Sequence, residues 1–234
     1  MNMFPLEKAG GYLLARIDGR SWLVDTGMPW SVGQGTLTID GRTFPLRPSP
    51  IPSFAPASIS AVVGQTVDGI VGGDVLRALG CRIDIAGQGI TFSPAVPRGI
   101  APVACRALSV AGTPLPAVAV RVFGRDLVLG FDSGAPLAYV MPDAFAFPER
   151  ADGSRREYVG MLDCWNDVAY WTSSTLVGAD SFRLSYAVLP TPLPMLLRLS
   201  GEAVDGIFGS ELADHAAVTL AAGWNEVYLE PYAA

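Results

Sequence analysis

The feature that most constrains how this chain of 234 residues can fold is an internal repeat. Residues 16–27 read Arg-Ile-Asp-Gly-Arg-Ser-Trp-Leu-Val-Asp-Thr-Gly, and residues 121–134 read Arg-Val-Phe-Gly-Arg-Asp-Leu-Val-Leu-Gly-Phe-Asp-Ser-Gly. Each copy predicts a strand, a Gly-Arg hairpin turn, a second apolar strand and then an Asp-hydroxyl-Gly triplet. The repeat therefore predicts two related units, each with an aspartate at the end of a strand.

A second pair of motifs recurs further along the chain in the same order. Residues 67–72 read Val-Asp-Gly-Ile-Val-Gly, and residues 204–209 read Val-Asp-Gly-Ile-Phe-Gly. Because two motifs recur in one order, we interpret the chain as an internal duplication. Each second motif is followed by a short helix-like segment and a predicted strand pair, at 82–85 with 89–92 and at 217–220 with 226–229.

Composition favours an all-β fold. Half of the residues are apolar and 16% are charged, which excludes a disordered chain. The 26 glycines and 19 prolines favour many short strands and turns over long helices. We expect few, short helices, at residues 74–79, 142–145 and 210–215, the last with Ser210 as its N-cap.

A proline-rich segment predicts the boundary between the two units. Residues 93–102 contain three prolines, and proline cannot lie in the centre of a sheet because it lacks a backbone N–H. We therefore predict an N-terminal lobe at residues 1–96, which carries Asp25. The C-terminal lobe at residues 97–234 carries Asp132 and a longer insertion.

Charge and hydropathy exclude several classes of function. The net charge is −6 and the longest basic run is a pair of arginines, so we expect no nucleic-acid partner. No uninterrupted apolar stretch approaches about 18 residues, and the N-terminus lacks a signal-peptide pattern. We therefore expect a cytoplasmic protein with no membrane association.

The cysteines and the single histidine offer little catalytic chemistry. Cys81, Cys105 and Cys164 lie far apart and form no CxxC pair, so neither a disulfide framework nor a metal site is expected. His215 is the only histidine, and its place near the end of a short predicted helix favours a surface residue. We expect no metal and no cofactor.

The two repeated aspartates offer a chemistry that needs neither metal nor histidine. Asp25 and Asp132 each follow an apolar strand, where a carboxylate is unfavourable unless it is paired or functional. If the two units face each other about a pseudo-twofold axis, the two carboxyl groups meet and share one proton. The ionised group can then take a proton from a water that attacks an amide carbonyl, while the protonated group hydrogen-bonds the carbonyl oxygen. The predicted catalytic residues are Asp25 and Asp132.

These residues also carry a family resemblance. Asp25-Thr26-Gly27 and Asp132-Ser133-Gly134, each followed downstream by two apolar residues and a glycine (Gly72 and Gly209), resemble the aspartic proteases of the pepsin and retropepsin clan. The resemblance extends over nearly the whole chain. It implies a bilobal pepsin-like fold, with two related β-barrel-like lobes and a cleft between them. It also implies an endopeptidase that acts on peptides or proteins and is open to pepstatin-type inhibitors.

The same resemblance implies roles for the residues around the dyad. Thr26 and Ser133 would hydrogen-bond across the lobe interface. Gly27 and Gly134 would let the two backbones approach closely, because glycine has no Cβ. Gly72 and Gly209 would lie in the loops under the two catalytic turns.

The sequence departs from the pepsin pattern after each triplet. Met28 and Ala135 stand where pepsins carry Ser or Thr. Loss of a hydroxyl hydrogen bond to an ionised carboxylate raises the pKa of that carboxylate, so we expect an activity optimum at mildly acidic to neutral pH. Because the chain is shorter than pepsin-like enzymes but holds both units, we expect trimmed loops and a monomer.

The hairpin that covers the cleft in the pepsin family, called the flap, is also expected to differ in this chain. The interval from Asp25 to Asp68 holds five prolines between residues 45 and 56 and no tyrosine, which is unfavourable for a pepsin-type flap. The longer interval from Asp132 to Asp205 contains an aromatic segment at 158–171 that predicts a hairpin, so we expect the flap to come from the second lobe. The candidate flap and cleft residues are Tyr158, Met161, Trp165 and Trp30.

Two other functions remain open from the residues alone. The first is a non-catalytic descendant of the same fold that binds a peptide or a partner protein. The second is an unrelated pair of β-barrels in which the repeated aspartates are turn residues. Asp68 and Asp205 precede glycines, and we interpret them as structural turn residues rather than catalytic groups.

Overall fold

The apolar segments of the repeat form paired strands. The computed structural model describes residues 2–110 and 113–233. Strands make up 48% of the chain and helices 14%, which confirms the predicted all-β character with few short helices. In both copies the hairpin turn contains a glycine with a left-handed φ, 74° at Gly19 and 73° at Gly124. Only a residue without a Cβ adopts this conformation readily, so the Gly-Arg turns close both hairpins.

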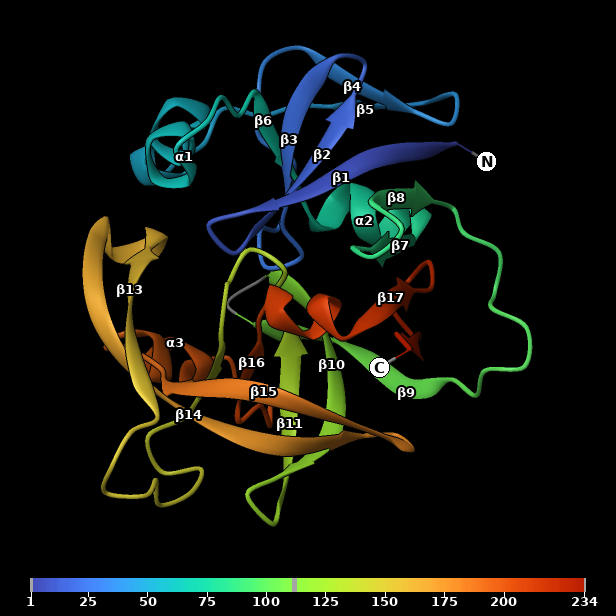
Figure 1. Ribbon diagram of the computed structural model, residues 1–234. Helices are drawn as coiled ribbons and strands as arrows, with labels where there is room; N and C mark the ends of the chain where they lie inside the picture. The colour runs from blue at the N-terminus through green and yellow to red at the C-terminus, as the bar shows by residue number, and fades with distance from the viewer. Residues whose placement is uncertain (1, 111–112, 234) are drawn as a thin grey trace.

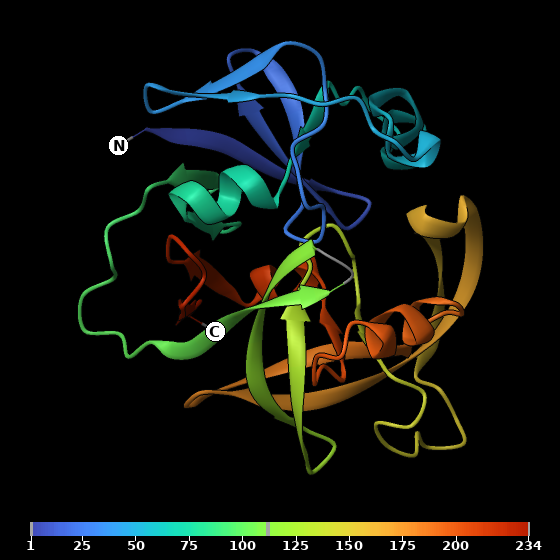
Figure 2. The same cartoon turned by 180° about the vertical axis from the view of Figure 1, so that it is seen from behind.

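The first half of the chain contains eight strands and three short helical segments, in the order β1 Met3–Ala9, β2 Tyr12–Ile17, β3 Arg20–Val24, β4 Thr36–Ile39, β5 Arg42–Pro45, the 3-10 turn η1 Pro52–Phe54, α1 Pro56–Val63, β6 Gly69–Val71, α2 Gly73–Leu79, β7 Cys81–Asp84 and β8 Gly89–Phe92. A segment without helix or strand follows at residues 93–102 and contains the predicted lobe boundary. It swings away from the rest of the molecule in both views of the ribbon (Figures 1 and 2).

The second half begins with β9 and contains longer strands, in the order β9 Val103–Val110, β10 Thr113–Val122, β11 Arg125–Phe131, β12 Ala138–Val140, β13 Gly153–Val159, the 3-10 turn η2 Gly160–Leu162, β14 Cys164–Val177, β15 Asp180–Val188, α3 Leu193–Leu199, β16 Gly206–Phe208, the 3-10 turn η3 Ser210–Asp214, β17 Ala216–Leu220 and β18 Glu226–Pro231. The two halves lie one above the other in Figure 1, with β13 and β14 rising beside the first half.

The same strand topology occurs in both halves. In the first half β2 and β3 form an antiparallel hairpin, and β3 pairs in parallel with β6. In the second half β10 and β11 form the hairpin, and β11 pairs in parallel with β16. Each parallel pair sets a downstream glycine motif beside an Asp-hydroxyl-Gly triplet.

The two halves are joined through the strands that follow each second motif. The strand pairs predicted there form as β7 with β8 and as β17 with β18. β7 and β17 are also paired with each other, with Ile83 opposite Val218, so one continuous ladder of hydrogen-bonded strands crosses from one half to the other. Buried apolar side chains of both halves form a single core cluster around it.

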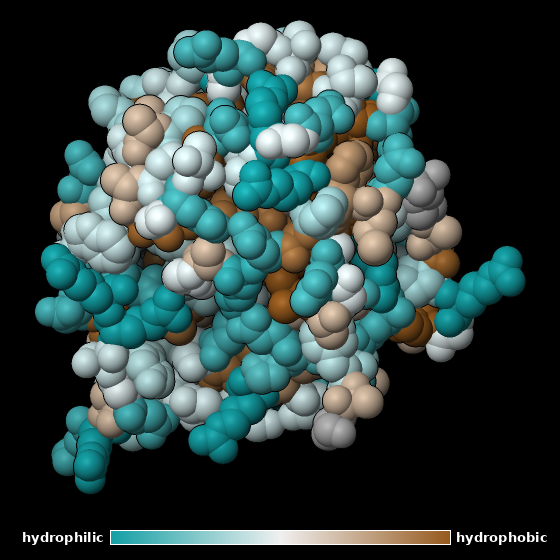
Figure 3. Space-filling view, turned by 45° about the horizontal axis from the view of Figure 1, so that its top comes forward, coloured by the Kyte–Doolittle hydropathy of each residue, from teal (hydrophilic) through white to brown (hydrophobic). Residues whose placement is uncertain are grey.

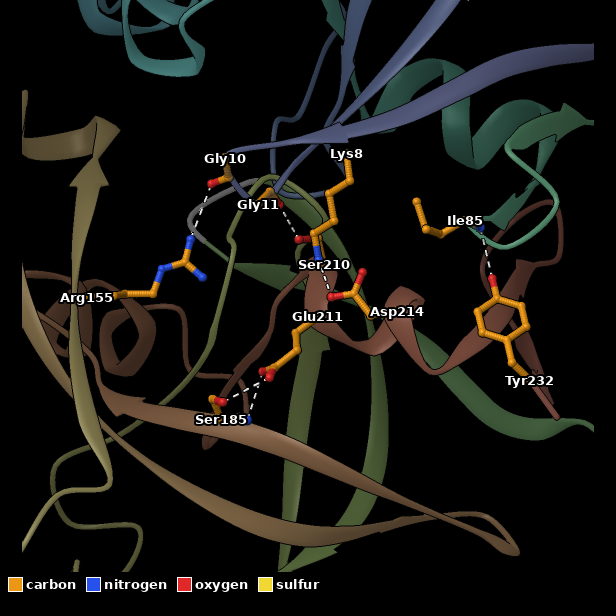
Figure 4. Close-up of polar contacts among 10 residues, drawn as sticks. All are labelled: Lys8, Gly10, Gly11, Ile85, Arg155, Ser185, Ser210, Glu211, Asp214 and Tyr232. Atoms are coloured by element: carbon orange, nitrogen blue, oxygen red, sulfur yellow. Dashed lines mark hydrogen bonds and ion pairs between the residues drawn. The ribbon is translucent and has the colours of Figure 1, made fainter. Parts of the chain in front are cut away.

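Side-chain contacts add to this junction (Figure 4). Lys8 on β1 forms an ion pair with Asp214 at 2.6 Å, and the hydroxyl of Ser210 donates to the carbonyl of Gly11. At the far side the hydroxyl of Tyr232 accepts a hydrogen bond from the backbone N–H of Ile85 at 2.9 Å. These contacts hold the N-terminal strands against η3 and the C-terminal end of the chain.

Two of the predicted helical features are wrong. Residues 142–145 form turns rather than a helix, because Phe145 is drawn into an aromatic cluster with Phe123, at a ring distance of 4.4 Å, and with Phe147. Ser210 does not cap its helix. Gly209 holds the cap position of η3, and the Ser210 hydroxyl is used in the contact between the halves.

Two helices were not predicted. α1 lies directly after the proline-rich stretch and begins at Pro56, a position where proline is favourable because the first N–H groups of a helix have no intrahelical partner. α3 likewise carries proline in its first turn. Within the described part of the chain, no helix is long and apolar enough to cross a membrane. On the face in Figure 3, apolar atoms are interspersed with polar ones.

Candidate active site

The two Asp-hydroxyl-Gly triplets begin where β3 and β11 end. The backbone N–H of Asp25 donates to the carbonyl of Val71 at 3.0 Å, and that of Asp132 donates to the carbonyl of Phe208 at 2.9 Å. The two parallel strand pairs therefore continue for one residue into the triplets and fix the start of each loop.

The two loops are bound to each other by a reciprocal set of hydrogen bonds. The backbone N–H of Thr26 donates to Ser133 Oγ at 3.0 Å, and the backbone N–H of Ser133 donates to Thr26 Oγ1 at 2.9 Å. Each hydroxyl in turn donates to the strand of the other half, Thr26 to the carbonyl of Phe131 and Ser133 to the carbonyl of Val24. Both hydroxyl side chains are fully buried, so every one of these groups depends on its partner across the interface.

The glycine of each triplet lies against the carboxyl group of the other. A Cβ atom added at Gly27 would overlap the Asp132 carboxyl group, and one added at Gly134 would overlap the Asp25 carboxyl group. Neither glycine has a left-handed φ, so close approach rather than backbone conformation requires glycine at these two positions. The missing Cβ atoms let the two carboxyl groups face each other.

Asp25 is buried and Asp132 is partly buried, and both carboxyl groups are hydrogen-bonded by their own loops. Asp25 Oδ1 accepts hydrogen bonds from the backbone N–H groups of Gly27 at 2.9 Å and Met28 at 3.0 Å. Asp132 Oδ1 accepts one from Gly134 at 3.0 Å. Each carboxyl group also affects the titration of the other, because the two lie close together.

The electrostatics favour one retained proton. Burial raises the pKa of Asp25, and the N–H bonds from its own loop oppose this only in part. Burial and the negative charge of Asp25 raise the pKa of Asp132 well above its ordinary value. Because the two groups are coupled, the proton belongs to the pair, and the pair keeps it to higher pH than an isolated aspartate would.

The two downstream glycines lie beneath these loops. A Cβ at Gly72 would overlap the backbone of Trp30, and one at Gly209 would overlap the backbone carbonyls of Ala135 and Leu137. The chain that follows each triplet therefore passes directly over each glycine.

An acidic residue two positions after each of these glycines supports a serine. Asp74 accepts hydrogen bonds from the backbone N–H and the hydroxyl of Ser31, both at 2.8 Å. Glu211 accepts the same pair of bonds from Ser185, at 2.8 and 2.9 Å. The second pair is drawn in Figure 4.

Asp68 and Asp205 hold the strands that lead into the two Asp-hydroxyl-Gly loops. Asp68 accepts a hydrogen bond from the backbone N–H of Ser21 on β3 at 2.8 Å, and Asp205 accepts one from Val128 on β11 at 2.8 Å. Both carboxylates are used in backbone contacts, as expected of turn residues.

A pocket of about 370 Å³ opens over the two aspartates. Three of the four predicted flap and cleft residues line it together with Asp25 and Asp132, namely Trp30, Tyr158 and Met161. Trp165 does not reach the pocket. It lies directly opposite Tyr158 in the β13–β14 hairpin, and its exposed ring packs between Tyr158 and the guanidinium of Arg156.

One wall of the pocket is formed where the two halves touch. The predicted aromatic segment forms the turn of the β13–β14 hairpin, with η2 at its tip. The hydroxyl of Ser53 in η1 donates to the carbonyl of Gly160 at 2.6 Å, and the ring of Phe54 packs against the same glycine. The tip of the hairpin therefore rests on the proline-rich segment of the first half.

Sequence reasoning missed several residues of the pocket. Glu157 and Tyr139 line it, as do Pro50, Ile51 and Phe54 from the proline-rich segment. Glu157 directly precedes Tyr158, so strand alternation counted from the predicted cleft residue Tyr158 would place Glu157 on the opposite face and gave no signal for its position in the pocket. No pattern in the proline-rich segment indicated that it folds over the dyad.

The remaining polar candidates lie outside the pocket. His215 ends η3 and does not line it, and all three cysteines are unbridged. Among residues 2–110 and 113–233, no group of three or more His, Cys, Asp or Glu side chains is arranged to hold a metal ion.

Comparison with known proteins gives no assignment. No protein-family model matches the chain, and no curated protein matches it.

Proposed function

We propose that this chain is a bilobal, pepsin-like aspartic endopeptidase that hydrolyses peptide bonds with Asp25 and Asp132. The observation that carries the proposal is the reciprocal bonding of the two triplets, which brings the Asp25 and Asp132 carboxyl groups together in the lining of one pocket. Two carboxyl groups with one proton between them supply an acid and a base at the same place.

The proposed mechanism follows from the shared proton. The ionised carboxylate takes a proton from a water held between the two groups as that water attacks the scissile carbonyl carbon. The protonated partner donates a hydrogen bond, and then its proton, to the carbonyl oxygen as the tetrahedral intermediate forms. Collapse of the intermediate returns a proton to the pair and transfers one to the leaving amine, so the pair ends in its starting state.

The walls of the pocket fit an extended peptide with apolar side chains. Trp30, Ile51 and Phe54 come from the first half, and Tyr158, Met161 and Leu193 come from the second. A strand-like peptide presents alternate side chains to opposite walls. The β13–β14 hairpin is the proposed flap, since residues at its tip line the pocket that contains the two aspartates, and its contact with η1 would open to admit substrate.

The pH optimum follows from the raised pKa values of the dyad. Activity needs the pair singly protonated, so it falls when the pair loses its last proton at high pH and when it gains a second proton at low pH. Because burial raises both pKa values, we expect a bell-shaped profile with its maximum at mildly acidic to neutral pH. A maximum below about pH 3 would contradict this account.

A peptide library tests the proposal. The purified protein is incubated with the library from pH 3 to 8, with and without pepstatin, and the products are read by mass spectrometry. We expect cleavage by the wild type and a loss of at least about 1,000-fold in kcat/KM in both Asp25→Asn and Asp132→Asn. Asp126→Asn, which changes an exposed carboxylate on β11, is the matched control. A folded wild type that binds peptides but cleaves none would favour a non-catalytic peptide-binding protein.

A further inference from the structure

A third carboxylate lies in the pocket beside the dyad, and the proposed mechanism does not use it. Glu157 is on β13, in the strand that carries the proposed flap, and only 2% of its surface is exposed. It lines the same pocket as Asp25 and Asp132. A buried carboxylate in a ligand pocket needs donors, because an unpaired buried charge is strongly unfavourable.

The protein supplies only part of the donors that Glu157 needs. The guanidinium of Arg155 forms an ion pair with Glu157 Oε1, and the Tyr139 hydroxyl is the other polar neighbour of the carboxylate. Both oxygens of the Glu157 carboxylate are buried, and neither forms a well-aligned hydrogen bond with a group of the described residues. The carboxylate in the wall of the pocket therefore has one partly exposed cationic partner and room for a further donor.

Arg155 does not fully neutralise this charge inside the pocket. Its side chain is 36% exposed, against 1% for Glu157, so solvent screens its charge more strongly. Its guanidinium also donates to the carbonyl of Gly10 at 3.3 Å, which holds it toward the β1–β2 turn (Figure 4). It does not line the pocket.

The charges that face the pocket all have one sign. The carboxylic acids that line it are Asp25, Asp132 and Glu157, and none of the lysines, arginines and histidines in the described part of the chain lines it. With one proton on the dyad, the dyad and Glu157 each carry a negative charge. A concave site with apolar walls concentrates this potential and favours a cationic ligand group.

On the proposed peptidase function, we infer that Glu157 makes this enzyme prefer peptides with a lysine or arginine side chain near the scissile bond. The ammonium or guanidinium group would donate to Glu157 Oε2. The methylene stem of either side chain would pack on the apolar residues beside it, such as Val159 and Leu193. Burial raises the pKa of the Glu157 carboxyl, and an incoming cation favours its ionised form.

Matched peptides test the inference. Fluorogenic peptides that differ only by lysine or norleucine at one position, scanned through the positions on both sides of the scissile bond, are assayed at about pH 6.5, where an ordinary glutamate is ionised. The wild type should favour lysine at one position at least about tenfold in kcat/KM, the lower range for a hydrogen bond to a charged group. Glu157→Gln should bring this ratio close to one, and Glu149→Gln, at an exposed glutamate outside the pocket, should keep it.

The ratio is taken within each variant, so it does not depend on the fraction of folded protein. Cleavage with no preference for lysine at any position, or an equal preference in wild type and Glu157→Gln, would overturn the inference and leave the peptidase proposal standing. Absence of cleavage of every peptide by the folded wild type would overturn the peptidase proposal itself.

Discussion

The two halves of the molecule agree around the aspartates and differ in everything that covers them. Both carry the hairpin, the triplet, the parallel strand beside it and an acidic residue that holds a serine. Between the triplet and the downstream motif, the first half places a small hairpin, η1 and α1. The second half places the long β13–β14 hairpin, β15 and α3. The duplicated parts build the carboxyl pair, and the parts that are not duplicated build the pocket walls.

This division separates two kinds of substitution. A change in the duplicated parts should have the same effect in either half, because each loop depends on the other. A substitution in the pocket walls should have no counterpart with the same effect in the other half. It should change the affinity for substrate more than it changes the geometry of the Asp25–Asp132 pair. The following predictions compare the two halves in these terms.

The largest effect is expected at the triplet glycines. Gly27→Ala and Gly134→Ala each place a Cβ against the opposite carboxyl group and should separate the dyad. We expect both to lower kcat by about 100-fold or more, because displacement of about 1 Å in an active site has effects of this size. Steady-state kinetics on one peptide checks this prediction. Gly19→Asn and Gly124→Asn, at turn glycines in open space whose left-handed φ asparagine tolerates, should stay within about twofold of wild-type kcat. A large effect at only one of the two triplet glycines would contradict the equivalence of the two loops.

The hydroxyl pair should matter for stability equally in both halves. Thr26→Val and Ser133→Ala each leave a buried N–H and a buried carbonyl of the other half without a partner. We expect each to lower the free energy of unfolding by about 2 kcal/mol. Urea denaturation followed by circular dichroism measures it, with Ser58→Ala, which removes an exposed hydrogen bond, as the control. A loss confined to one of the two variants would show that the bonding is not reciprocal in solution.

The next prediction concerns the tip of the β13–β14 hairpin, the proposed flap, which has no equivalent in the first half. Replacement of residues 158–165 by Asn-Gly joins the paired residues Glu157 and Asn166 through a two-residue turn and removes the tip. We expect kcat/KM to fall about tenfold, since the pocket loses the cover that positions substrate and excludes water. Trp165→Ala, which changes only an exposed residue outside the pocket, should keep most of the activity. Full activity in the shortened protein would assign the flap elsewhere.

The smallest expected effect is a gain in stability on loss of the dyad. The folded-state pKa of Asp132 is raised, so its contribution to stability is present at low pH and is lost as pH rises through that pKa. Asp132→Asn removes the charge and should raise the free energy of unfolding by about 1 kcal/mol at pH 8, and by less at pH 5. Thermal unfolding at the two pH values measures this, with Asp126→Asn as the exposed control. A gain that grows as pH falls would reverse the sign of the argument.

The sequence predicted the duplicated parts well because they are local and repeated. Strand, turn and triplet follow one another within about 15 residues, so glycine turns and apolar runs specify them directly. The meeting of Asp25 and Asp132 is a long-range contact, and only the duplication made it predictable. Their placement in one pocket is a property of how the halves pack.

The covering regions were harder to predict because tertiary contacts decide them. The proline-rich segment gave no sign of η1 and α1, since prolines at the start of a helix are favourable while prolines within a strand are not. Phe145 lies in a turn rather than in the predicted helix, and its ring packs in an aromatic cluster with Phe123, which is distant in the sequence. Trp165 and Tyr158 lie opposite each other in the hairpin, yet only Tyr158 lines the pocket, a difference that the aromatic pattern of the sequence does not show.

The most direct test of the account is a titration of the aspartate carboxyl carbons by ¹³C nuclear magnetic resonance. The account predicts that two resonances titrate together in coupled steps, with one step well above the ordinary aspartate range, and that Asp25→Asn or Asp132→Asn abolishes this coupling. Independent titration of both groups near about pH 3.9, unaffected by substitution of the other, would contradict it.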